Sequence, residues 1–168
     1  MGCIGALFRI PFGAVLGYLV MMAGVFAAFT AVMVLAGTDF CFEGDSWVAS
    51  EKFCVIGLGV FGVAALLGGF TAVRIGGAVA VLLLCLFFGA LGSLTALGML
   101  GEARLKDMKE NRPEDRPVDL TPMQAAQWSE TPTWSEWGNL AAGLGGIAVG
   151  AAAGRGAPRE QKRAKPKD

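Results

Sequence analysis

Four cysteines are the residues of this chain best suited to covalent chemistry, and two of them bracket one short polar segment. Cys41 and Cys54 each stand next to a long apolar block. If those blocks are neighbouring antiparallel helices, about 8–10 Å apart, short extensions could bring the two Cα atoms within the roughly 4.4–6.8 Å of a disulfide. A bridge closing this loop would stabilise the fold by roughly 3 kcal/mol, in an oxidising compartment. We predict this disulfide, with two unpaired interfacial thiols as the alternative.

Metal and cofactor chemistry is not expected. The chain has no histidine, so two thiols this far apart leave a zinc ligand set incomplete, and histidine ligation of haem is excluded. Cys3 and Cys85 have no obvious partner, and Cys85 lies in the apolar run Leu83-Leu-Cys-Leu-Phe-Phe88. We therefore predict no metal site and no cofactor.

The residues that acid–base catalysis or ion-coupled transport require are also missing. The apolar blocks contain no Asp, Glu or Lys, and their one charged residue is Arg74. Coupled transporters keep such groups inside the helical bundle. The run Gly57-Leu-Gly59-Val-Phe-Gly62 matches a dinucleotide fingerprint only in part and lacks the preceding strand. We expect no catalytic residues, no enzyme activity, no nucleic-acid binding and no small-molecule substrate identifiable from sequence.

Three long uncharged blocks predict the structural elements. The blocks are Ile10–Thr38, Phe53–Val73 and Ile75–Gly101, with 29, 21 and 27 residues. A bilayer core of about 30 Å needs roughly 20 helical residues, and the blocks lack the alternation of a membrane barrel. We predict an all-α integral membrane protein with membrane helices at 10–38, 53–73 and 76–101, in a chain that is 54% hydrophobic and only 17% charged.

Arg74 decides the topology of the second and third blocks. It is the only charge between Phe53 and Gly101, and one helix over those 49 residues would be about 73 Å long. The block must fold back. Glycine pairs flank Arg74 on both sides and allow the positive φ of a tight turn, so we place the turn at residues 74–75. The alternative, an arginine buried in the bilayer, would need an acidic partner that the blocks do not offer.

A fourth, weaker segment spans residues 137–154. It has few large aliphatic residues but a small-residue face with a period of four: Ala142, Gly146, Gly150 and Gly154. Such faces let helix backbones approach closely in lipid, and the pattern is that of a glycine zipper. We predict a fourth membrane helix here, with three membrane helices as the alternative.

Charge predicts the orientation through the positive-inside rule. With four spans, residues 1–9, the turn at 74–75 and the tail at 155–168 share one side, with eight basic and two acidic residues. The outer loops, 39–52 and 102–136, then hold six basic and twelve acidic residues. We therefore place both termini in the cytoplasm, and the Ala-, Gly- and Val-rich composition favours a bacterial inner membrane. With three spans the outer loops would exchange sides, because the second of them and the tail share eleven basic residues.

Tryptophans and capping patterns favour four spans. All four tryptophans, Trp47, Trp128, Trp134 and Trp137, fall in the outer segments, as interfacial anchors would. Thr133-Trp-Ser-Glu136 resembles a capping box that starts the fourth helix. Thr121-Pro-Met-Gln124 is a second such pattern, and it predicts a short helix through Trp128 within an outer loop that we expect either to dock a partner or to act as a plain connector. Residues 102–110 are expected to extend the third helix into water.

These observations favour a non-enzymatic membrane protein that packs against partner membrane proteins as an accessory, assembly or scaffold subunit. Gly13 and Gly17 in the first block add a second small-residue pair that could contact subunits or a second copy. The alternative is a homo-oligomeric pore or small-solute permeation protein, although the spans lack the polar stripe that a hydrated pore needs.

Overall fold

The computed structural model describes residues 2–99, 112–117 and 120–156, and these residues form helices without a strand. The helices are α1 (Gly2–Ala36), α2 (Thr38–Cys41), α3 (Glu51–Ala96), α5 (Pro122–Trp128) and α6 (Thr133–Gly156). The all-α prediction is confirmed. Within the described chain, two helical stretches, Phe8–Ala36 and Glu51–Ala96, are long and apolar enough to cross a membrane, each with a mean hydropathy of 2.4.

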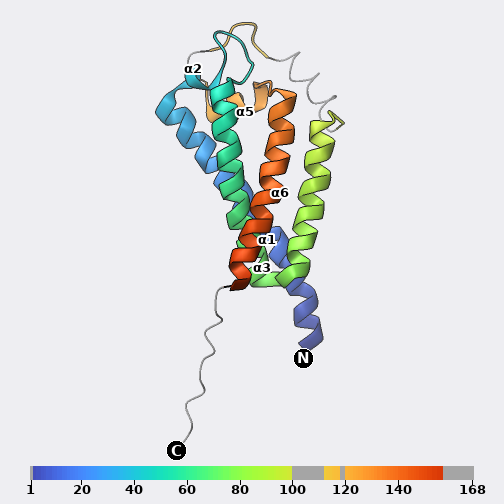
Figure 1. Cartoon of the computed structure of the whole chain (residues 1–168). Coiled ribbons are helices and arrows are strands. Elements are labelled where there is room, and N and C mark those ends of the chain that lie inside the picture. The colour runs from blue at the N-terminus through green and yellow to red at the C-terminus, as the bar shows by residue number, and fades with distance from the viewer. Residues whose placement is uncertain (1, 100–111, 118–119, 157–168) are drawn as a thin grey trace, which may run out of the picture.

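Helix α3 is a hairpin of two helical halves joined at Gly77. Gly77 has φ 75° and ψ −164°, a conformation that strains any residue with a Cβ, and the chain reverses there (Figure 1). Arg74 lies in the last helical turn before the reversal, three residues ahead of Gly77, so the reversal comes later in the chain than the turn predicted at residues 74–75. Its guanidinium lies over the Phe70 ring, 5.3 Å from the ring centroid. Ser50 caps the start of the first half, and its hydroxyl accepts a hydrogen bond from the Phe53 amide.

The second half of α3 ends earlier than the predicted boundary at Gly101. Gly98 has φ 75°, its amide donates to the Thr95 carbonyl, and the Met99 amide donates to the Leu94 carbonyl. This pair of bonds is a Schellman motif, which satisfies the last carbonyls and stops a helix. The expected extension over 102–110 lies outside the described residues.

Helices α1 and α6 occupy opposite grooves of the α3 hairpin. Each packs along both halves of α3, and the two make no close backbone approach to each other within the described chain. The core between the helices is apolar, and its most buried large side chains are Met21 on α1, Leu84 on α3 and Ile147 on α6. Figure 1 shows the resulting bundle, with α6 lying between the two halves of α3.

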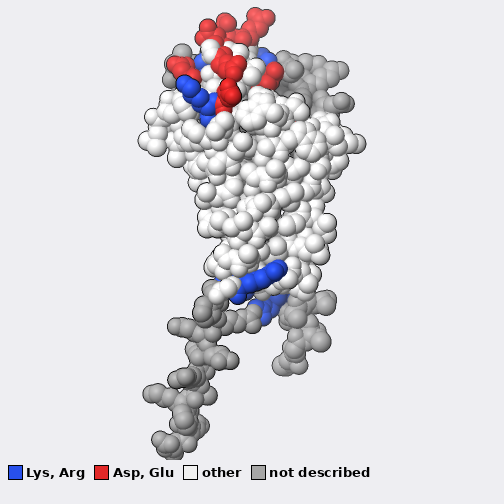
Figure 2. Space-filling model, viewed as in Figure 1, with Lys and Arg blue, Asp and Glu red and all other residues white. Residues whose placement is uncertain are grey.

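The surface of the bundle is apolar along its length and charged at its ends. Only 17% and 22% of the most apolar stretches of α1 and α3 is buried, whereas a core helix of a soluble protein would be mostly buried. Acidic side chains gather at one end together with some basic ones, only basic side chains show at the other end, and a broad uncharged surface lies between them (Figure 2). The basic end carries Arg74, next to the α3 reversal, and Arg155, in the last turn of α6.

Candidate functional site

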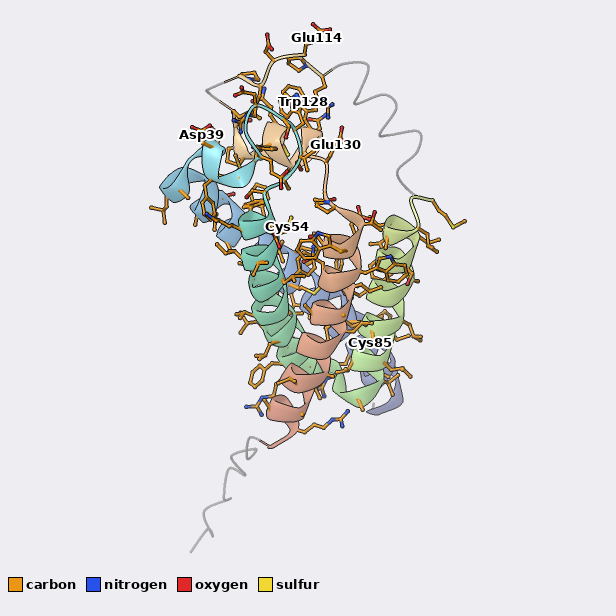
Figure 3. The ribbon with its side chains drawn as sticks, turned by 45° about the horizontal axis from the view of Figure 1, so that its top comes forward. Asp39, Cys54, Cys85, Glu114, Trp128 and Glu130 are labelled. Carbon is orange, nitrogen blue, oxygen red and sulfur yellow. The ribbon has the colours of Figure 1, made fainter. Side chains whose placement is uncertain are left out.

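A compact cap closes the acidic end of the bundle; we define the cap as residues 37–50, 112–117 and 120–132. Two distant segments are joined in it by backbone pairing. The Ala49 amide donates to the Glu130 carbonyl at 2.9 Å, and the Glu130 amide donates to the Trp47 carbonyl at 2.8 Å. Asp39, Trp128 and Glu130 accordingly gather at this end, whereas Cys85 lies far down the bundle (Figure 3).

Arg112 fastens one side of the cap. Its guanidinium donates to the Glu130 carboxylate at 2.8 Å and to the Trp128 carbonyl at 3.3 Å. The same group lies 5.4 Å from the centroid of the Trp47 ring, a cation–π arrangement that favours a partly desolvated arginine. One side chain therefore holds both segments of the cap together.

Arg116 fastens the other side and is more deeply placed, with a side chain that is only 8% exposed. It donates to the carbonyls of Thr38 at 3.1 Å and Gly44 at 2.9 Å, and to the Asp39 carboxylate at 3.0 Å. Its guanidinium also lies over the Phe42 ring, 5.0 Å from the centroid. A planar group with several fixed donors suits this task better than lysine does. Neither arginine stood out in the sequence, because spacing along the chain does not show which carbonyls will converge.

The aromatic residues of the cap form its core. Trp47 is 5% exposed, and its ring meets Phe42 and Trp128 edge-on at centroid distances of 6.0 and 5.5 Å. Of the four tryptophans predicted to anchor the chain at an interface, Trp47 thus packs inside the cap, and the partly buried Trp128 packs against it. Trp134 and Trp137, at the start of α6, are 46% and 45% exposed and remain on the surface.

Cys41 and Cys54 are free, buried thiols, so the structure lacks the predicted disulfide. The Cys41 Sγ instead points back along its own helix to the Gly37 carbonyl, 3.5 Å away. Ser50 lies between the two backbones: its amide donates to the Cys41 carbonyl, and its carbonyl accepts from the Cys54 amide. Burial raises the pKa of the Cys41 thiol, and nearby Arg116 opposes that rise.

The capping pattern at Thr121 predicts α5 correctly. The Thr121 hydroxyl accepts from the Gln124 amide, the Gln124 side chain accepts from the Thr121 amide, and the helix runs from Pro122 to Trp128. Helix α6 also begins where predicted, at Thr133. Its Glu136 carboxylate, however, accepts from the Thr131 hydroxyl at 3.1 Å rather than bonding as the proposed box would require.

Beneath the cap lie two adjoining cavities of about 320 and 310 Å³, which together we call the chamber. The larger cavity lies between α1, the first half of α3, α5 and α6, and the smaller one extends toward the second half of α3. Four lining residues are common to both: Met22, Phe61, Thr131 and Asn139. These volumes fall at the lower end of the range of about 300–1,000 Å³ that is typical of ligand sites.

The chamber is apolar except for a few side chains that face it. Thr30 Oγ1 and Asn139 Oδ1 are both buried and have no hydrogen-bond partner within the described protein. A buried polar atom left without a partner costs about 1–3 kcal/mol. Glu136 is the one charged residue among the described residues that line the chamber. Nothing in the sequence distinguished Thr30 or Asn139 from other polar residues within apolar helices.

The glycines of α1 pack within the chain. A Cβ atom on Gly13 would lie 2.7 Å from the Gly76 nitrogen, and one on Gly17 would lie 2.7 Å from the Gly68 carbonyl oxygen. These separations are too short for real Cβ contacts, so the α1 and α3 backbones approach each other where neither carries a side chain. Gly13 and Gly17 are therefore occupied by contacts to α3.

The predicted small-residue face of α6 also lies against α3; its members are Ala142, Gly146, Gly150 and Gly154. A Cβ atom on Gly146 would collide with the Gly62 carbonyl, and one on Gly150 would collide with the Leu66 carbonyl. This face, which the sequence suggested for partner contacts, is thus used to close the bundle.

A second small-residue face of α6 points outward. It consists of exposed residues at helical spacing: Ala141, Gly145, Ala148 and Ala152. A Cβ atom on Gly145 would meet nothing within 4 Å. On α6, the only exposed large hydrophobic residues are Trp134, Trp137 and Val149, whereas α1 and both halves of α3 present many.

Comparison with protein-family models, with curated proteins and with solved structures gives no match. Within the described part of the chain, no group of three or more His, Cys, Asp or Glu side chains is placed to hold a metal ion. The features available for a functional argument are therefore the cap, the chamber and the outward face of α6.

Proposed function

We propose that this chain is a non-enzymatic integral membrane protein that crosses the bilayer four times and serves as an accessory or assembly subunit. In this proposal a helix of a partner membrane protein packs on the outward small-residue face of α6. The observation that carries the proposal is that face, which is open, shallow and unlike the outer surfaces of the other helices.

The uncharged height of the bundle supports membrane insertion. The charge-free part of α3 from Phe53 to Val73 has 21 residues, or about 31 Å at 1.5 Å per residue. The charge-free part of α6 from Trp137 to Gly154 has 18 residues, or about 27 Å. Both lengths match a hydrocarbon core of about 30 Å. The α3 hairpin then supplies two crossings, and α1 and α6 supply one each.

The distribution of charge supports the orientation. Arg9, Arg74 and Arg155 lie at the same end of the bundle: Arg9 and Arg74 flank the close contact of α1 with Gly76, and Arg155 ends α6. Positive residues favour the cytoplasmic side, which puts both termini in the cytoplasm and the cap outside, as expected for a bacterial inner membrane.

Helix α6 is the natural docking surface within this arrangement. Large outward side chains, such as those of α1 and α3, interdigitate well with lipid tails. A face of Ala and Gly offers lipid little to pack against, but it lets another helix backbone approach closely and gain dispersion energy. Because the neighbouring glycine face is already occupied by α3, the free face at Gly145 remains for a partner.

A site-specific photo-crosslinker tests the docking surface in native membranes. We place the crosslinking residue at Gly145 or, as a matched control, at Gly59, an exposed glycine of α3 whose Cβ position is also open. We expect Gly145 to yield one discrete adduct with a different membrane protein and Gly59 to yield only lipid adducts. Gly145→Leu should then abolish co-purification of that partner, and Gly59→Leu should not.

Other results would reject the accessory role. An adduct between two copies of this chain at Gly145 would indicate a homo-oligomer and would direct attention to conductance measurements in liposomes. Lipid adducts alone at both positions would remove the outward face of α6 as a docking surface.

A further inference from the structure

The chamber has walls, a roof and a side opening. Its walls are apolar side chains of α1, α3 and α6, and its roof is formed by α5 through Pro122, Ala125 and Ala126. Two wall residues of α1, Met22 and Phe26, are 39% and 54% exposed, so this wall reaches the apolar outer surface of the bundle. A molecule would therefore enter from the side, out of the surrounding apolar phase, and not through the charged cap.

Two polar atoms in the chamber favour a ligand with a hydrogen-bonding group over a purely apolar one. Thr30 is on α1 and Asn139 is on α6, two helices that do not approach each other directly. Both side chains line the larger cavity, and the hydroxyl oxygen of one and the amide oxygen of the other are buried without a partner in the described protein. Asn is also a poor residue for a helix interior, so its place here calls for a compensating interaction.

The charge around the chamber narrows the class of ligand. No lysine or arginine stands among the described lining residues, and the single charged one, Glu136, is acidic. An anionic head group would find no cation and would be repelled by that carboxylate. A neutral hydroxyl group can donate to the Asn139 amide oxygen and accept from the Thr30 hydroxyl, while the apolar body of the molecule contacts aromatic and aliphatic side chains of the chamber.

We propose that the chamber beneath the cap binds a neutral, membrane-soluble molecule with a long apolar body and a hydroxyl head. The head group bonds to Thr30 and Asn139 under the α5 roof, and the body leaves between the helices toward the lipid. The ligand thereby connects α1 with α6 below the cap. This inference goes beyond partner docking, because the chamber lies on the interior side of α6 and the docking face lies on its exterior.

The test uses the purified full-length protein in detergent micelles and three diazirine probes of one chain length. The probes are a long-chain primary alcohol, the corresponding carboxylic acid and the corresponding hydrocarbon. We expect saturable labelling of chamber-lining peptides by the alcohol, competed by excess unlabelled alcohol, with weaker labelling by the acid. Thr30→Val keeps the shape of the side chain and removes its hydroxyl. It should lower alcohol labelling about three- to tenfold, the net worth of one hydrogen bond, and leave hydrocarbon labelling unchanged.

Thr71→Val is the matched control. Thr71 lies in the apolar part of α3 and donates to the Leu67 carbonyl, away from the chamber lining. This variant should label like the unmodified protein. Asn139→Leu provides a second reading and should reduce alcohol labelling in the same way.

Three outcomes would overturn the proposal: no saturable labelling of the chamber by the alcohol, equally strong labelling by the acid, or unchanged alcohol labelling in both Thr30→Val and Asn139→Leu. Labelling in micelles needs no partner protein, so a failed docking test leaves this result intact. Gly145→Leu, which disables the proposed docking face, should leave alcohol labelling unchanged.

Discussion

Replacing Gly150 by alanine tests the close packing of α6 on α3. The new methyl group would collide with the Leu66 carbonyl oxygen. A backbone carbonyl cannot rotate away as a side chain can, so α6 must shift outward along this interface. Overpacking of this kind typically costs about 1–3 kcal/mol. The substitution also gains about 1 kcal/mol, because alanine is the better helix former.

Gly145→Ala separates the two effects. Gly145 lies on the same helix as Gly150 but faces open space. Its replacement by alanine therefore brings the gain in helix propensity without a collision with the α3 backbone. The difference in unfolding free energy between the two variants therefore isolates the overpacking cost. We expect Gly150→Ala to be less stable than Gly145→Ala by about 1–3 kcal/mol.

The assay is equilibrium unfolding of the purified protein in mixed micelles with increasing SDS, followed by tryptophan fluorescence. Trp134 and Trp137 report on the start of α6. Equal midpoints for the two variants would refute the reasoning, because they would mean that the α6 and α3 backbones are not in contact at Gly150.

Three further predictions concern the cap and the topology. Arg116→Lys should loosen the cap by about 1.5–3 kcal/mol, because lysine cannot replace the fork of charged hydrogen bonds; faster limited proteolysis within the cap would reveal it, and an unchanged cleavage rate would contradict it. The raised pKa of the buried Cys41 thiol means that this thiol loses its proton at a lower pH in the unfolded chain than in the folded one, so stability should fall as pH rises past the ordinary thiol value of about 9.0, and Cys41→Ala should make that fall smaller. Asp45→Cys and Ala78→Cys, both exposed at opposite ends of the bundle, should react with an impermeant maleimide from opposite sides of the membrane; labelling of both from one side would exclude the four-span topology.

The helices were predictable where residues close together in the sequence determine them. Apolar block length indicated the long helices, and the capping pattern at Thr121 defined α5. The glycine-rich stretch after Arg74 was the natural place for a reversal, but composition could not choose among its glycines, since φ at Gly77 depends on how both halves pack. The end of α3 was missed because Gly98 reads as one more glycine in an apolar run.

The candidate site was much less predictable, because it is made by contacts between distant segments. In the sequence, Arg112 and Arg116 resemble the solvent-exposed charges of a connecting loop. Their contacts with cap carbonyls and aromatic rings arise only from the tertiary fold. Trp47 fitted a membrane-anchor pattern equally well before Trp128 was known to cover it. The spacing of the α6 glycines predicted close helix packing. Periodicity alone, however, does not show whether the neighbouring backbone belongs to the same chain or to a partner.

The cap also carries a consequence for the order of events during synthesis. Arg116 bonds to residues 72 to 78 positions earlier in the chain, and the Glu130 backbone pairs with the segment around Trp47. A nascent chain has therefore made the α3 hairpin long before it can cover Phe42 and Trp47. Until Glu130 has been synthesised, those rings form an exposed hydrophobic surface next to the incomplete bundle. We expect this interval to be the most aggregation-prone stage of biogenesis, and chaperones that bind the unfinished cap would have most effect during it.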